Sequence, residues 1–202
     1  MARTKIKNGD IVQVPLPNDL GFAYAKYIDL LEINPNNKYP SLIRVYNVRE
    51  LDSNFLIDNL ANKELILSPL LIAGIAPTIS KGIWKILGNV SVTEEEKVIP
   101  HYKTSKLPPR IKEDDWYYVI DADISKKIKS SYDNVKHLEN IGATGSALVG
   151  TKIAMALIKD EGKKIEDYFE LKEFFEKSYY EDISEIAAYY KQPEKNRGKA
   201  LI

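Results

Sequence analysis

The sequence predicts an α+β protein: an N-terminal antiparallel, twisted β-sheet or SH3-like partial barrel, followed by a C-terminal helical region. Short β-forming apolar runs, separated by Pro, Asn, Asp and Gly, fill the first half of the 202-residue chain. In the second half, apolar residues recur at steps of three and four, as on a buried helix face. We expect a β-rich region at 1–122 and a helical region at 123–202, packed together as one compact unit.

Composition narrows the function classes. Lys and Arg number 29, and so do Asp and Glu, so no net positive field draws this chain to nucleic acid or to an acidic membrane. The absence of cysteine excludes disulfides and thiolate chemistry and fits a reducing cytoplasm, where we expect the protein to act. The basic start of the sequence has no apolar core after it, so we expect no secretory signal. Apolar runs are too short and interrupted for a membrane span.

The first element is a predicted hairpin. Residues 11–16 and 22–28 are apolar runs around the loop 17–21, which contains Pro, Asn, Asp and Gly. Pro15 cannot donate a ladder hydrogen bond, so we expect the first strand to lie at an edge or to end in a bulge there. Apolar residues continue to Ile33, which predicts a long second strand that can bend.

Two further segments alternate as half-buried strands do. Residues 41–48 predict a strand with Ile43 and Val45 buried. Residues 81–89 predict another, with Trp84 facing the core.

Between those two strands the pattern is weaker. Residues 54–65 are ambiguous and allow a short helix. Residues 66–71 return to a strand pattern, in which Pro69 marks an edge or a bulge. Residues 72–79 contain Gly and Pro, which predicts strand followed by irregular chain.

The second half begins with one more strand. Residues 116–120 are rich in aromatic and β-branched side chains, and this strand either rejoins the first sheet or caps its edge. From residue 121 onward we expect helical chain, with a helix over 131–140 that Gly142 ends.

Two longer helices complete the prediction. Val149, Ile153 and Leu157 recur at four-residue steps and predict a buried helix, with Thr144 or Ser146 as its cap and Gly162 at its end. The three- and four-residue spacing then continues from Ile165 until Pro193 stops it.

The strand and turn residues of the first half resemble one known family. Residues 9–17 (GDIVQVPLP), 21–26 (GFAYAK) and 82–89 (GIWKILGN) resemble the bacterial immunity protein 26 family of polymorphic toxin systems, over roughly residues 5–105. Ala25 departs from the pattern, in which we expect Gly. The resemblance implies a protein that binds a cognate toxin domain, neutralises it by occlusion and carries out no catalysis.

Residue types that carry chemistry are sparse. His101 and His137 lie in different segments and have no metal-ligand spacing. Ser146 lacks the second Gly of a nucleophile elbow, because Leu148 stands there. We therefore expect no catalytic residues, no metal and no cofactor.

For a toxin partner, the sequence offers one candidate contact surface. Binding interfaces use aromatic anchors with a charged rim. We expect such a surface to combine the acidic run with an acidic-aromatic segment: Glu94, Glu95, Glu96, Asp114, Asp115, Trp116 and Tyr117. An acidic patch of this kind suits a basic toxin that cleaves nucleic acid.

The alternative is an SH3-like barrel that binds or cuts RNA. Residues 9–12 (GDIV) also resemble the opening of the toxin ribonucleases of toxin–antitoxin pairs, but the Arg-Pro of that pattern is missing here. A basic groove with stacking aromatics would need Lys26, Arg44 and Arg49 near Tyr24 and Tyr46. The neutral charge balance argues against a nucleic-acid partner.

Overall fold

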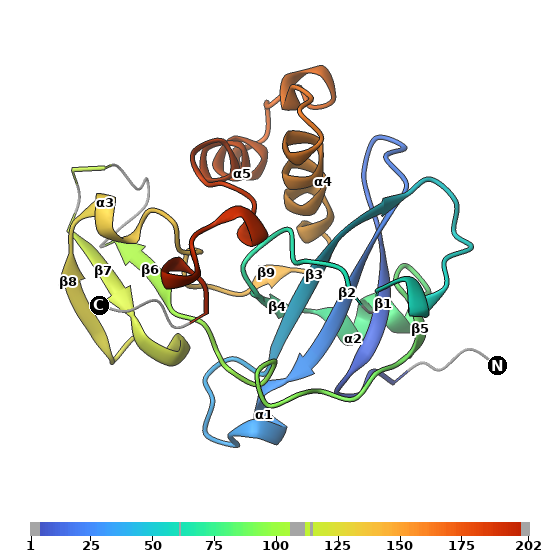
Figure 1. The fold of residues 1–202 in the computed structure, drawn as a ribbon, viewed down its shortest axis with the longest axis horizontal. Coiled ribbons are helices and arrows are strands. Elements are labelled where there is room, and N and C mark those ends of the chain that lie inside the picture. Colours follow the sequence, from blue (N-terminus) through green and yellow to red (C-terminus); the bar gives the residue numbers. More distant parts are fainter. Residues whose placement is uncertain (1–4, 61, 106–111, 114, 199–202) are drawn as a thin grey trace.

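The computed structural model describes residues 5–60, 62–105, 112–113 and 115–198 (Figure 1). The strands are β1 (Asp10–Pro15), β2 (Phe22–Asp29), β3 (Ser41–Glu50), β4 (Leu70–Ala73), β5 (Lys85–Asn89), β6 (Tyr102–Ser105), β7 (Trp116–Val119), β8 (Lys127–Ser130) and β9 (Thr144–Gly145). The α-helices are α1 (Leu30–Ile33), α2 (Ile75–Ser80), α3 (Tyr132–Val135), α4 (Val149–Asp160) and α5 (Phe174–Glu185). Short 3₁₀ turns are η1 (Ile57–Leu60), η2 (Ile120–Ala122), η3 (Ile165–Asp167), η4 (Tyr189–Lys191) and η5 (Glu194–Asn196).

The described strands form two sheets. The larger has six strands in the order β5-β1-β2-β3-β4-β9, and the smaller has three in the order β6-β7-β8. All pairs are antiparallel except β4 with β9. Figure 1 shows the small sheet beside the large one, with α4 and α5 above both. The predicted α+β class, with an antiparallel sheet first and the longer helices last, is confirmed.

The large sheet packs its main core against α4. Ala23, Ala25 and Tyr27 of β2 share this face with Ile43 and Val45 of β3, and all are buried with the apolar residues of α4. Because side chains alternate along a strand, the intervening residues of β2 and β3 point to the opposite face. That opposite face carries the candidate site.

The predicted hairpin is confirmed, but the prediction for Pro15 is wrong. β1 lies between β2 and β5 and is not an edge strand. β5 pairs only with residues from Asp10 to Gln13, whereas Pro15 pairs with Phe22 on the β2 side. The missing N–H therefore costs no ladder bond, and the register irregularity of β1 lies earlier, between Ile11 and Val12.

β2 ends earlier than its apolar pattern predicts. The carboxylate of Asp29 accepts hydrogen bonds from the backbone N–H groups of Leu31 and Glu32 and caps α1. The strand over 41–48 is confirmed with Ile43 and Val45 fully buried, and Trp84 is 2% exposed before β5.

The segment 72–79 differs from its prediction. After β4 the chain turns through Gly74, whose φ is +73°, and forms the helix α2. Pro77 lies in the first turn of α2, where the backbone N–H has no partner within the helix, so its ring is tolerated. In the ambiguous segment 54–65, the described residues form the 3₁₀ turn η1, and Leu65 makes an isolated β-bridge with Tyr46.

The second half agrees with prediction at α4 and differs before it. β7 joins neither edge of the large sheet but pairs with β6 and β8, and β8 is a strand where we expected helical chain. α3 covers only the first turn of the predicted helix over 131–140. α4 begins after Leu148 without a side-chain cap, so neither Thr144 nor Ser146 caps it. The division at residue 122 stays a prediction.

Candidate functional site

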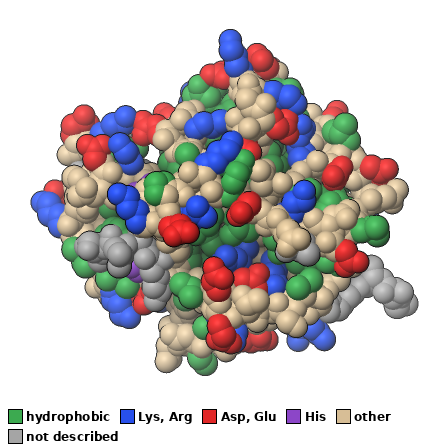
Figure 2. All heavy atoms as spheres, in the orientation of Figure 1, with side chains coloured by type: hydrophobic (Ala, Val, Ile, Leu, Met, Phe, Trp, Pro, Cys, Tyr) green, Lys and Arg blue, Asp and Glu red, His purple; other side chains and the backbone are tan. Residues whose placement is uncertain are grey.

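A groove of about 830 Å³ lies on the face of the large sheet opposite α4. Its floor is β1, β2 and β3, and its walls are the segments 57–65, 90–100 and 189–198. Figure 2 shows this hollow over β2 and β3, with Lys and Arg side chains deep inside and Asp and Glu side chains along its lower rim.

The strand register produces a polar floor between two apolar clusters. Ile11, Lys26 and Arg44 stand directly opposite one another across β1, β2 and β3. One side of this row is covered by a cluster that includes Tyr24 and Leu60, and the other by the cluster that includes Ile28 and Tyr102. Two cations facing each other across a strand pair repel, so the floor needs a counter-charge.

Glu96 supplies that counter-charge and forms an ion pair with Lys26. The Lys26 Nζ donates to Glu96 Oε2 at 2.6 Å and to the Ser91 carbonyl at 2.8 Å, and the Lys26 side chain is only 2% exposed. Burial opposes ionisation of Glu96, but the hydrogen bonds from Lys26 and from the Thr93 N–H hold its pKa below the ordinary value. The Thr93 hydroxyl in turn accepts from the Glu96 N–H, which forms a capping box.

Arg44 is the floor cation that has no ion pair among the described residues. Its half-buried side chain makes no hydrogen bond or ion pair with any other residue that the structure describes. Tyr46, two residues along β3, lines the same groove, and burial, followed by the nearby charge of Glu96, raises its pKa to about 12. The floor thus offers a guanidinium and the phenol hydroxyl of Tyr46 to an acidic group.

The rim carries charges of both signs. Four exposed carboxylates line the groove and take part in no ion pair within the described ranges: Asp58, Glu64, Glu95 and Glu194. Lys63 and Arg197 lie among them, and the Arg197 Nε donates to the Gln192 carbonyl. The groove therefore combines a cationic point on its floor with a mainly acidic rim.

The predicted acidic run divides into three different environments. Glu94 is 90% exposed and pairs with Lys97 at 2.6 Å. Glu95 lines the groove, and Glu96 is bound to Lys26 beneath it. Of the three side chains, only Glu95 is both at the groove and free of an ion pair.

The other half of the predicted surface belongs to the small sheet. Trp116 is 3% exposed and packs with Val135 and Leu138. Asp115 pairs with Lys129 at 2.8 Å, and the Lys127 ammonium lies over the Tyr117 ring. Asp114 lies outside the described residues. β7 and the segment 90–100 belong to different parts of the fold (Figure 1), so the structure does not bring the seven predicted residues into one patch.

Most of the residues proposed for RNA binding are buried or already paired in the fold. Tyr24 is fully buried and stacks on Phe55 with ring centroids 3.9 Å apart. Arg49 forms a two-pronged pair with Glu161, at 2.8 and 2.7 Å, and Lys26 is paired as above. Only Arg44 and Tyr46 of that proposed set remain available in the groove.

Within residues 5–60, 62–105, 112–113 and 115–198, no three His, Asp or Glu side chains converge in a way that would hold a metal ion. No helix in the same ranges has the length and apolar character needed to cross a bilayer.

Most of the charged residues on the groove rim were not predicted from the sequence. Asp58, Lys63, Glu64, Glu194 and Arg197 come from segments that are far apart in sequence and meet only when the chain folds. One local signal was present: Thr93 followed three residues later by Glu96 is a capping-box pattern, which marks Glu96 as a structural residue.

Comparison with known families decides the relationship. The model of the family described as immunity protein 26 matches residues 7–110, half of the chain. The chain belongs to the immunity protein 26 family. No curated protein and no solved structure matches it. The match contains β1, β2 and β3 and two walls of the groove, whereas the third wall, 189–198, lies outside it. Membership makes immunity to a toxin the role of this chain.

Proposed function

We propose that this immunity protein binds a cognate toxin domain through the groove, neutralises it by occlusion and carries out no catalysis. The single observation that carries the proposal is the unpaired Arg44 on the groove floor, surrounded by unpaired rim carboxylates. A charge that folding leaves without a partner in a concave site is available to a binding partner.

Charge complementarity defines the kind of partner. The rim acids Asp58, Glu64, Glu95 and Glu194 favour basic residues, and Arg44 favours one acidic group near the centre of the contact. A protein surface supplies both signs, whereas a nucleic-acid backbone would be repelled by the rim. Toxins that cleave nucleic acid need basic surfaces, so we assign the partner to that class and the complex to the bacterial cytoplasm.

The experiment compares two neighbouring glutamates. The cognate toxin domain is titrated by calorimetry with the wild-type protein and with the variants Glu95→Lys and Glu94→Lys. Glu95→Lys places a cation on the groove rim and should weaken binding at least tenfold, whereas Glu94→Lys, outside the groove, should leave the affinity unchanged.

Two results would contradict the proposal in different ways. Equal affinities for all three proteins would remove the groove as the contact surface. Absence of wild-type binding, together with no rescue of cells that express the toxin domain, would remove the neutralising role itself.

A further inference from the structure

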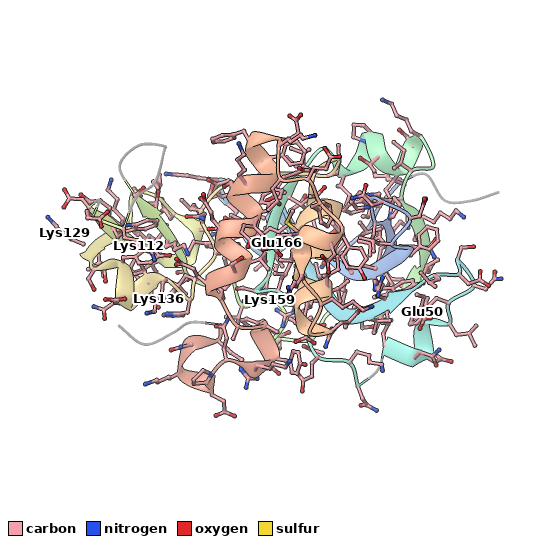
Figure 3. All side chains as sticks on the ribbon, turned by 90° about the horizontal axis from the view of Figure 1, so that it is seen from above. Glu50, Lys112, Lys129, Lys136, Lys159 and Glu166 are labelled. Carbon is pink, nitrogen blue, oxygen red and sulfur yellow. The ribbon has the colours of Figure 1, made fainter. Side chains whose placement is uncertain are left out.

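A second, smaller cavity of about 350 Å³ lies among α4, α5, the segment 66–68 and the chain around η4. Lys159 of α4 lies between α4 and α5 in the view onto the helices (Figure 3) and lines this cavity. The chain at η4 closes one side, because the N–H groups of Tyr189 and Tyr190 donate to the carbonyls of Ile66 and Leu65. This volume falls within the range of small-molecule sites.

The charged groups of the cavity wall are already satisfied. The Lys159 Nζ donates to the carbonyls of Ile183, Ser184 and Ile186 at 2.6, 2.9 and 3.0 Å. Asp160 accepts from Lys191, Tyr190 and Asn47.

The remaining two acids of the wall are also engaged. Glu139 pairs with Lys152 at 2.5 Å, and both oxygens of Asp182 accept from the Asn140 amide. A charged ligand would therefore find no unsatisfied counter-charge and would lose its hydration without compensation.

Two neutral polar atoms of the wall lack a partner. Gln192 is 5% exposed, and its Oε1 is buried without a hydrogen bond. Its Nε2 donates to the Ala187 carbonyl at 3.0 Å, which identifies the nitrogen and leaves the carbonyl oxygen unsatisfied. The Nε2 of His137, which also lines the cavity, is buried and unpaired as well. Unsatisfied buried polar atoms are rare in folded proteins and call for a partner.

We propose that this cavity binds an uncharged small molecule with an N–H or O–H donor for Gln192 Oε1 and an apolar body. The body would lie against the aliphatic side chains of the wall, Ile66, Leu67, Ala156, Ile183 and Ile186. A neutral amide fits best, because its N–H can donate to Gln192 Oε1, and its own donor and acceptor can serve either tautomer of His137 at Nε2. This cavity adjoins the groove, because Tyr189 lines both, but the proposal does not rest on the toxin contact.

The test uses three probes of nearly equal shape. Benzamide is neutral and has the donor, acetophenone is neutral and lacks it, and benzoate is charged. Each is titrated into ¹⁵N-labelled full-length protein, and the backbone signals of 187–192 and the Gln192 side-chain amide are followed by NMR. Benzamide should bind about tenfold more tightly than acetophenone, the usual effect of one buried hydrogen bond, and benzoate should not bind.

Two variants connect the result to the cavity. Gln192→Leu should abolish the preference for benzamide over acetophenone, and Ala156→Leu should fill the cavity and prevent binding of both. A thermal melt checks that each variant is folded. If Ala156→Leu does not fold, the comparison with Gln192→Leu alone tests the proposal. The proposal is overturned if benzamide produces no saturable shift, which would leave only water in the cavity. Equal affinity for benzamide and acetophenone, binding of benzoate, or unchanged binding by the folded variants would also overturn it.

Discussion

Buried charges are paired differently in two regions of the molecule. In the groove, Lys26 and Arg44 face each other across β2 and β3, and one carboxylate, Glu96, forms an ion pair with Lys26 and not with Arg44. In the interior, a closed cluster of Lys103, Glu139, Lys152 and Asp182 lies between the small sheet and the helices α4 and α5. There, Lys152 contacts Glu139 at 2.5 Å and Asp182 at 3.9 Å.

The closed cluster contains no unused charge. The Lys103 Nζ donates to the Lys136 carbonyl at 2.9 Å and lies 5.9 Å from the centre of the Trp116 ring. Burial lowers its pKa despite the nearby charges of Asp182 and Glu139. The two regions therefore differ in role: the cluster joins the small sheet to the helices, whereas the groove leaves Arg44 available for the toxin partner that we propose.

The largest expected effect is in the closed cluster. Lys152→Met leaves Glu139, only 8% exposed, as an uncompensated buried charge. We expect a loss of about 3–5 kcal/mol in the free energy of unfolding, the usual result of breaking a buried pair from one side. Urea denaturation at pH 7 measures it. The exposed Lys163→Met, which removes a pair with Glu161, should change it by less than about 0.5 kcal/mol.

A double variant separates buried charge from lost packing. Lys152→Met combined with Glu139→Leu should recover most of the lost stability, because both charges are then gone. No recovery would mean that the cluster stabilises the fold through geometry that apolar side chains cannot reproduce.

The groove pair should contribute less to stability. Lys26→Met removes two hydrogen bonds from a buried ammonium, but the Glu96 side chain is 19% exposed and water can replace part of the contact. We expect a loss of about 2 kcal/mol in the same denaturation experiment. A loss equal to that of Lys152→Met would erase the distinction between the two regions.

Local patterns in the sequence were sufficient for several elements but not for all of them, and not for the site. The hairpin, the strand that contains Ile43 and Val45, and α4 each have a periodicity that a single segment displays. β8 was missed because a short edge strand with two exposed lysines has no buried face to mark it. The groove could not be predicted, because the Lys26–Arg44 pair depends on strand register and the rim on three distant segments.

Arg44 should matter for binding and not for folding. Because it has no partner within the described residues, Arg44→Gln should change the free energy of unfolding by less than about 0.5 kcal/mol. Affinity for the toxin domain should fall about tenfold, which corresponds to about 1.4 kcal/mol. Denaturation and calorimetry on the same sample measure the two effects. A large loss of stability with unchanged affinity would make Arg44 a structural residue.

The smallest expected effect is a difference in how the stabilisation from each of the two regions depends on pH. The pKa of Glu96 is lowered in the folded protein, so its stabilisation is complete above the ordinary pKa of about 4.5 and disappears as the pH falls through the lower folded value. The pKa of Lys152 is raised, since attraction to Glu139 and Asp182 outweighs burial, so its stabilisation is complete below its ordinary value and is lost as the pH rises through the folded one.

The pH dependence of the Glu96 contribution and that of the Lys152 contribution can be measured separately. The stability difference between wild type and Glu96→Gln, about 1 kcal/mol or less, should be present at pH 7 and shrink below pH 4.5. The difference between wild type and Lys152→Met should persist through that acid range, because Lys152 keeps its charge there. If Glu96→Gln lost stability at alkaline pH instead, Glu96 would not be the ionised partner of Lys26. The groove floor would then hold two uncompensated cations, and the argument for Arg44 as its single free charge would fail.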